Sequence, residues 1–219
     1  MAYDVKPNQN TSLEDINTIT NPNTKTMIDR YVWAANFCKG KDVLDCASGH
    51  GYGAFILRGL GARFVQCLDI DKETVDILAR RKDTDSIVVA KEDITRPLND
   101  WAENNYDVVV SIETFEHVPR EGVQQMLENF KYVCKPGGKI IITTPCRHTE
   151  SFEYKGGTHL YEYNINEFIG ELQRVFKNIE MHYIIEFRHP ISPELNSLFT
   201  QDHQFADKCS VMVAVITNE

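Results

Sequence analysis

A short apolar strand that runs into a glycine-rich turn constrains this chain more than any other stretch. Residues 42–53 read DVLDCASGHGYG, and apolar residues at helical spacing follow them in AFILR. A strand, a tight glycine turn and a helix in this order bring backbone N–H groups close to a ligand. Asp45 stands at the tip of the strand. Its negative charge argues against a phosphate ligand and for a cationic or hydroxyl-bearing one.

The spacing of the glycines separates this turn from a dinucleotide-binding turn. Such a turn follows the pattern G-x-G-x-x-G, whereas Gly49, Gly51 and Gly53 lie at every second position. The sequence therefore disfavours an NAD-dependent oxidoreductase. An ordinary strand-to-helix turn, with glycines for tight packing, stays open as the structural alternative.

The turn resembles motif I of the class I S-adenosylmethionine (SAM)-dependent methyltransferases, in which an apolar pair and an Asp precede Gly-x-Gly-x-Gly. This chain departs from the pattern at the first glycine, where Ala47 stands. We expect the alanine to be tolerated, because the position should need only a negative φ. The resemblance implies that Asp45 lies near the methionine amino group of SAM and that Ala47, Gly49 and Gly51 line the cofactor.

Strand and helix patterns alternate over the first two-thirds of the chain, which indicates right-handed βαβ units and a parallel sheet. The last two expected strands, at 179–187 and 209–217, are joined only by a loop at 188–208, so they can pair antiparallel. With the resemblance, this predicts an α/β, Rossmann-like class I methyltransferase fold. Its sheet should be mostly parallel and seven-stranded, with an antiparallel C-terminal strand and helices on both faces. Residues 1–23 are predicted as a loosely ordered arm, and residues 24–219 as one domain.

Acidic residues end three successive strands at equal intervals, at Asp45, Asp69 and Asp93. In an open α/β sheet, ligands bind beyond the carboxyl ends of the strands. The resemblance implies that Asp69 accepts both ribose hydroxyls and that Asp93 receives the adenine amino group. It also places Ile70 and Ile94 against the adenine ring.

Two further residues are expected at the cofactor site, and the acids at the strand ends have an alternative explanation. Ser111 and Glu113, at the end of the fourth strand, are expected to contact the cofactor. The alternative is that acids follow strands because they cap helices, which is the interpretation we favour for Asp71.

The segment Glu113-Thr-Phe-Glu-His117 is the sequence's strongest indication of the reaction. Residues three and four apart share a helical face, so Glu113, Glu116 and His117 can converge. Two carboxylates and an imidazole are plausible ligands of a divalent metal. His159 lies in the loop after the fifth strand, which should hang over the same end of the sheet.

This E-x-x-E-H pattern, with a later His before an aromatic-Glu-aromatic stretch, resembles the metal-dependent small-RNA 3′-terminal 2′-O-methyltransferases. Ubiquinone-pathway O-methyltransferases have a similar Glu-His arrangement. The resemblance implies Glu113, Glu116, His117 and His159 as ligands of Mg²⁺ or Mn²⁺. Many class I methyltransferases have Glu-His at this place with no metal. In that case Glu113 can face SAM, and His117 or His159 is the candidate general base, with Glu116 in the catalytic set.

Composition narrows the classes of partner. The chain has 219 residues and a net charge of −9, with no basic cluster, which counts against extended nucleic-acid binding. No apolar run is long enough to span a bilayer. The six cysteines include no C-x-x-C pair and read as reduced thiols of a cytoplasmic protein.

We therefore predict a SAM-dependent O-methyltransferase that acts on a small hydroxylated acceptor, sugar-like or aromatic, with a divalent ion as an option. The first alternative is methylation of an RNA 3′-terminal 2′-hydroxyl. The second is a non-catalytic SAM-binding partner protein, which the intact Glu113–His117 segment disfavours. The acceptor and the oligomeric state do not follow from one sequence.

Overall fold

The computed structural model describes residues 22–81, 86–98, 101, 103–151, 157–188 and 195–219. Most of the predicted N-terminal arm, residues 1–21, therefore lies outside the described residues. Pro22 and Asn23, which we assigned to the arm, already belong to helix α2 (Pro22–Ala34). Within the described residues, no helix is both long and apolar enough to cross a membrane.

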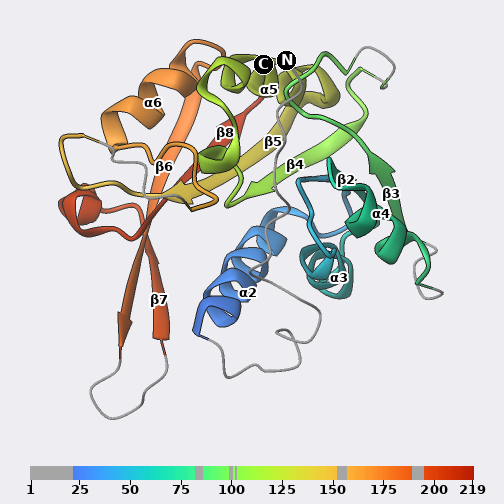
Figure 1. The fold of residues 1–219 in the computed structure, drawn as a ribbon, viewed down its shortest axis with the longest axis horizontal. Coiled ribbons are helices and arrows are strands. Elements are labelled where there is room, and N and C mark those ends of the chain that lie inside the picture. The colour runs from blue at the N-terminus through green and yellow to red at the C-terminus, as the bar shows by residue number, and fades with distance from the viewer. Residues whose placement is uncertain (1–21, 82–85, 99–100, 102, 152–156, 189–194) are drawn as a thin grey trace.

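The described residues form one eight-stranded sheet in the order β3-β2-β1-β4-β5-β8-β6-β7 (Figure 1). The strands are, in chain order, β1 (Asp42–Cys46), β2 (Phe64–Asp69), β3 (Ile87–Lys91), β4 (Tyr106–Ile112), β5 (Cys134–Pro145), β6 (Asn178–Arg188), β7 (Leu195–Thr200) and β8 (Val211–Thr217). Strands β1 to β5 are parallel, and β8 pairs antiparallel with both β5 and β6. The predicted Rossmann-like architecture and the antiparallel pairing of the last two predicted strands are confirmed.

The predicted strand count of seven is wrong, because β7 lies inside the segment expected to be a loop. The pairing of β6 with β8 ends at Ile184, so the rest of the long strand β6 needs another partner. Strand β7 supplies it, in antiparallel register from Tyr183–Thr200 to Arg188–Leu195. Phe199 of β7 also stacks on Trp33 of α2, with ring centroids 5.3 Å apart and an interplanar angle of 7°. The pairing joins two consecutive strands, whereas the contact with Trp33 is remote in sequence, and the local residue pattern of β7 did not reveal the strand.

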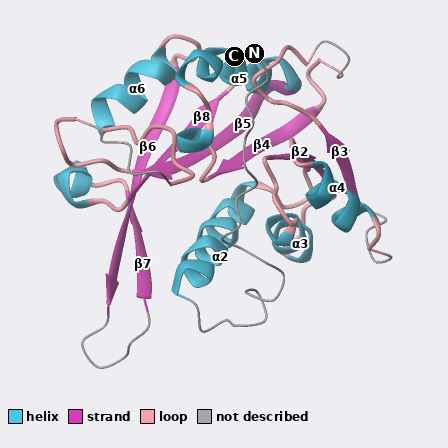
Figure 2. Cartoon of the chain, viewed as in Figure 1, coloured by secondary structure: helices cyan, strands magenta, loops and turns pink. Residues whose placement is uncertain are grey.

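Helices cover both faces of the sheet (Figure 2). One hydrophobic cluster packs α5 (Arg120–Val133) and α6 (Ile165–Gln173) against the sheet. The other packs α2, α3 (Tyr52–Gly59) and α4 (Lys72–Ala79) against the opposite face. Asp71 caps α4 by accepting from the backbone N–H groups of Glu73 and Thr74, which confirms the structural interpretation of Asp71.

The parallel strands all end at one rim of the sheet, and the residues predicted to carry function follow those ends. The rim falls into two regions. We call the ends of β1, β2 and β3 the cofactor rim, and the segments that follow β4 and β5 the reaction rim.

Candidate active site

Ala47 in the glycine turn has a backbone conformation that our prediction did not foresee. Its φ is +58°, in the left-handed region, so the expectation that this position needs only a negative φ is wrong. An L-residue in this region is strained by contact between Cβ and the backbone. The turn around Ala47 is fixed by backbone hydrogen bonds, in which Ser48 N–H donates to Leu68 O at 3.0 Å and Gly51 N–H to Ser48 O at 3.0 Å. The chain therefore tolerates strain where the methyltransferase pattern has glycine.

The three glycines of the turn have different uses. A Cβ on Gly51 would lie 2.5 Å from a methyl carbon of Leu78, and one on Gly53 would lie 2.1 Å from the ring of Tyr31. These two glycines make room for side chains of the protein itself. A Cβ on Gly49 would meet nothing within 4 Å, so open space adjoins the turn there.

Asp45 is fully buried at the end of β1. The Tyr31 hydroxyl donates to its Oδ1 at 3.2 Å, while its Oδ2 has no hydrogen-bond partner among the described residues. Burial raises the pKa of Asp45 to about 7, and the nearby charge of Asp69 also raises it, while the Tyr31 hydrogen bond lowers it. A buried carboxylate oxygen without a partner fits a cationic ligand group.

Asp69 at the end of β2 is held by backbone donors from two directions. Gly49 N–H donates to Oδ2 at 2.8 Å, and Asp71 N–H donates to Oδ1 at 2.9 Å. Burial raises the pKa of Asp69, and these two hydrogen bonds oppose the rise. Each oxygen keeps a lone pair for a further donor, such as a hydroxyl. Asp69 thus links the first strand end to the second.

The predicted adenine-binding residues differ in whether their side chains are exposed or already engaged in contacts within the protein. Asp93 Oδ1 accepts from Thr95 N–H at 3.0 Å and from Thr95 Oγ1 at 2.6 Å, and Oδ2 pairs with Arg96 Nε at 3.1 Å. Ile70 is 43% exposed, whereas Ile94 is 8% exposed and packs in the core. Of this set, Ile70 presents the most free apolar surface.

Ser111 and Glu113 lie on and just after β4. The Ser111 hydroxyl is buried without a partner among the described residues. Glu113 has φ +51°, and its carboxylate accepts from Thr143 Oγ1 at 2.7 Å. Its Oε1 also lies 3.8 Å from Nε of Arg30, a buried residue of α2 that pairs with Glu186 at 2.7 Å. Neither Arg30 nor Thr143 was a predicted site residue.

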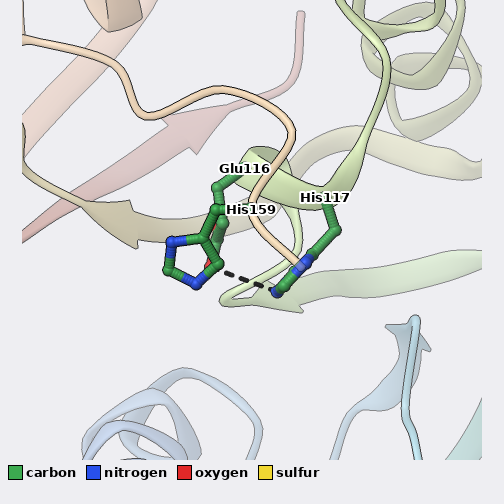
Figure 3. Close-up of side chains that lie close together, drawn as sticks. All are labelled: Glu116, His117 and His159. Atoms are coloured by element: carbon green, nitrogen blue, oxygen red, sulfur yellow. Dashed lines mark ion pairs between the residues drawn. The ribbon is translucent and has the colours of Figure 1, made fainter. Parts of the chain in front are cut away.

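Three of the four predicted metal ligands lie together at the reaction rim (Figure 3). Ligand atoms of Glu116, His117 and His159 are all within 4.8 Å of one another. Glu113 is not in this group, since its carboxylate is bound to Thr143 and faces Arg30. Figure 3 shows the three side chains pointing toward one another, from the segment after β4 and the loop after β5.

Hydrogen bonds orient both imidazoles of this cluster. His117 Nδ1 lies 2.8 Å from the Thr158 carbonyl oxygen, so Nδ1–H donates and Nε2 carries the free lone pair. His159 Nδ1 lies 2.6 Å from Glu162 Oε1, which fixes the same tautomer. A second partner on Nδ1 is the usual arrangement of histidines that bind a metal through Nε2.

Glu116 is 1% exposed, and within the described part of the chain only one of its two carboxylate oxygens accepts a hydrogen bond from a side chain. Thr144 Oγ1 donates to Oε2 at 2.9 Å, but Oε1 has no hydrogen-bond partner among the described residues, and its ion-pair neighbour is His117 Nε2 at 3.7 Å. Burial raises the pKa of Glu116 well above its ordinary value, and the charge of Glu113 adds to the rise. Burial also lowers the pKa of His117. A cation next to Oε1 would offset the free-energy cost of burying this carboxylate oxygen without a hydrogen bond.

The backbone of Glu116 positions the loop that carries His159. Its carbonyl oxygen accepts from Leu160 N–H at 2.7 Å and from Tyr161 N–H at 3.2 Å. The sequence placed His159 over the rim but gave no sign of these bonds or of Thr144 and Thr158. Glu162 had a signal, because it is the acid of the aromatic-Glu-aromatic stretch that drew attention to His159.

Comparison with known proteins finds similarity to methyltransferases. Residues 44–142 match a family model described as "Methyltransferase domain". The chain is 33% identical over 122 residues to a probable SAM-dependent methyltransferase from Mycolicibacterium smegmatis, covering 55% of this chain and 44% of that protein. It is 31% identical over 114 residues to a ubiquinone biosynthesis O-methyltransferase from Paraburkholderia phytofirmans, covering 52% of this chain and 48% of that protein. The matched part thus spans less than half the length of either relative.

Solved structures show the same fold. A SAM-dependent methyltransferase from Thermotoga maritima, described as a possible histamine N-methyltransferase, superposes with a TM-score of 0.65 and 13% sequence identity. The match covers 94% of this chain and 99% of that one. Residues 44–142, which include the glycine turn, are thus similar to a methyltransferase domain, and the described residues have the fold of these solved structures.

Proposed function

We propose that this protein is a SAM-dependent O-methyltransferase that methylates a hydroxyl group of a small polyhydroxylated or aromatic acceptor. The observation that carries the proposal is the cluster of Glu116, His117 and His159 at the reaction rim. An O-methyltransferase among the relatives supports transfer to oxygen.

The cofactor rim fits SAM by its chemistry. The unpaired Oδ2 of Asp45 suits the positively charged amino group of the methionine part. Asp69 offers one lone pair on each oxygen to the two ribose hydroxyls, beside the open space at Gly49. We therefore assign Asp45, Asp69 and Gly49 to SAM binding, with Ile70 against the adenine.

A divalent ion fits the cluster, with Glu116 Oε1 and the Nε2 atoms of His117 and His159 as ligands. One carboxylate and two imidazoles favour Mn²⁺ over Mg²⁺, since Mg²⁺ prefers oxygen ligands. Such an ion acts as a Lewis acid that lowers the pKa of an acceptor hydroxyl. Glu162 and Thr158 would hold the two imidazoles in the ligating tautomer.

Methyl transfer itself is an in-line displacement. The acceptor hydroxyl loses its proton, its oxygen forms a bond to the methyl carbon, and the electron pair of the broken S–C bond returns to sulfur. Without an ion, His117 Nε2 is the group placed to take the proton, because Nδ1 is held by Thr158 and burial keeps the ring neutral.

The test measures binding of the cofactor, binding of the metal and use of the acceptor in separate experiments. Calorimetry should show binding of SAM and none of NAD, and an Mn²⁺ titration followed by electron paramagnetic resonance should show one bound ion. Labelled SAM is then offered with a panel of hydroxylated small molecules, with and without EDTA. An RNA oligonucleotide with a free 3′ end serves as the second acceptor class.

Variants of the cluster and a matched control sharpen the test. Glu116→Gln and His159→Asn should keep SAM binding and lose both the Mn²⁺ signal and EDTA-sensitive turnover. Glu128→Gln, an exposed carboxylate on α5, should behave as the wild type. If turnover survives EDTA and His117→Asn abolishes it, His117 is the base and the metal is not part of the reaction. Failure to bind SAM would overturn the whole proposal.

A further inference from the structure

Two cysteines away from the proposed metal cluster lie against each other where β5 and β8 meet. Cys146 follows directly after β5, and Cys209 lies two residues before β8. Cys146 N–H donates to Ser210 O at 2.9 Å, which continues the ladder one step beyond the Pro145–Val211 pair. Both side chains pack with the same hydrophobic cluster, so they lie on the same face of the sheet. The Cys209 thiol donates to Ala206 O at 3.2 Å, and the Cys146 thiol lies close enough to interact with it electrostatically.

The two thiols differ in access and acidity. Cys146 is half-buried, whereas Cys209 is fully buried. Interaction with Cys209 lowers the pKa of Cys146, while interaction with Cys146 and burial raise the pKa of Cys209. An accessible thiol with a lowered pKa beside a buried one is the usual arrangement of an attacking and a resolving cysteine.

The remaining cysteines do not share these features. Cys38, Cys46, Cys67 and Cys134 are all fully buried. Cys46 and Cys67, on the neighbouring strands β1 and β2, belong to the clusters on opposite faces of the sheet. The accessible thiol and its partner are therefore found together at Cys146 and Cys209.

This pair lies at the base of the loop that carries His159. Cys146 forms an isolated parallel bridge with Tyr163, at the far end of that loop. The next residue, Arg147, donates from Nε to Glu162 O at 2.8 Å and pairs with Glu167 at 2.6 Å. The His148 ring donates from Nε2 to Cys209 O at 2.8 Å. A covalent bond between the thiols would thus join β8 to the point where both ends of the loop converge.

We propose that Cys146 and Cys209 form a thiol–disulfide exchange site that closes into an intramolecular disulfide with a low-molecular-weight disulfide as the oxidant. The Cys146 thiolate attacks one sulfur of the small disulfide, which releases one small thiolate and leaves a mixed disulfide on Cys146. The Cys209 sulfur then attacks Cys146 Sγ and releases the second small thiolate. The two protein thiols are oxidised, the small disulfide is reduced to two thiols, and these take up the two protons.

The experiment treats the folded full-length chain with glutathione disulfide and then blocks free thiols by alkylation. Intact-protein mass spectrometry should show the loss of two hydrogen atoms, and peptide mapping should join the peptides that contain Cys146 and Cys209. Dithiothreitol should reverse the change. Cys134→Ser, at the other end of β5, is the matched control and should form the same disulfide.

Single variants identify the order of attack. Cys209→Ala should stop at a glutathione adduct on Cys146, because the resolving thiol is gone. Cys146→Ser should give neither adduct nor disulfide under the same conditions, and circular dichroism checks that both variants are folded. A wild type that keeps all its thiols, retains glutathione on Cys146, or links a different pair would overturn the proposal. None of these measurements uses methyl transfer, so they stand apart from the proposed function.

Discussion

The cofactor rim and the reaction rim are built from the same kind of strand end but are held in place in different ways. In the cofactor rim, Asp69 accepts hydrogen bonds from Gly49 and Asp71, within the two adjoining turns. In the reaction rim, His117 and His159 depend on a loop that folds back from beyond β5 onto Glu116. The hydrogen bonds on Asp69 join residues 2 and 20 positions apart, whereas the bond from His117 to Thr158 joins residues 41 apart.

The largest expected effect is on the pH dependence of the free energy of unfolding, and it comes from Asp45, the most deeply buried acid of the cofactor rim. Its pKa of about 7 in the folded state exceeds the ordinary 3.8, so the folded state binds the proton more tightly between these two values. Stability from this group is therefore highest below pH 4, falls as pH rises to 7, and is level above that. Asp45→Asn should remove this slope and be more stable at pH 8 by up to about 4 kcal/mol. Urea unfolding across pH measures it.

A second variant tests the cause of that slope. Tyr31→Phe removes the hydrogen bond that lowers the pKa of Asp45, so the decline in stability should extend to higher pH than in the wild type. Equal slopes in the wild type and Asp45→Asn would show that another group causes the pH dependence.

The next largest effect is on SAM binding. Asp69→Ala removes the acceptor of two backbone N–H groups and, in our proposal, of two ribose hydroxyls. We expect SAM affinity to fall about 100-fold, because hydrogen bonds to a charged group contribute about 1.5–3 kcal/mol each. Calorimetry checks this, with Asp76→Asn on the exposed face of α4 as the control. A change below about threefold would remove Asp69 from the cofactor site.

A smaller effect tests the reaction rim. Glu162→Ala removes the acceptor that orients His159 but leaves all three proposed ligands in place. We expect Mn²⁺ affinity to fall about tenfold, as is usual when the partner of a metal-bound imidazole is lost. Ion binding at the reaction rim would then depend on a residue that does not itself bind the ion. Unchanged affinity would mean that the hydrogen bonds to Glu116 O suffice to hold the loop.

The smallest effect concerns the strain in the glycine turn. Ala47→Gly should relieve the left-handed conformation and raise the free energy of unfolding by up to about 1 kcal/mol, since the entropic cost of glycine offsets part of the gain. Ala54→Gly, at the third residue of α3, should instead destabilise by about 1 kcal/mol. Denaturant unfolding compares the two. A loss of stability in Ala47→Gly would show that φ at this position carries no strain.

The same contrast explains what could be predicted from the sequence. Asp45 and Asp69 were predicted as site residues because each ends an apolar strand beside a recognisable turn. The strand β7 pairs with the preceding strand β6, but it was missed because the contact that packs it onto α2, Phe199 on Trp33, is remote in sequence. The placing of Glu113 among the metal ligands followed from helical spacing, whereas its left-handed φ turns it toward Thr143.

Gly53 shows that a glycine in this turn can be required by packing against a remote helix and not by a ligand. The Tyr31 ring occupies the place of its absent side chain, and the same ring reaches Asp45. Moved into another scaffold without α2, the turn would leave a hole over its own carboxylate and admit water there. A transplant of the proposed cofactor site must therefore take the preceding helix with it.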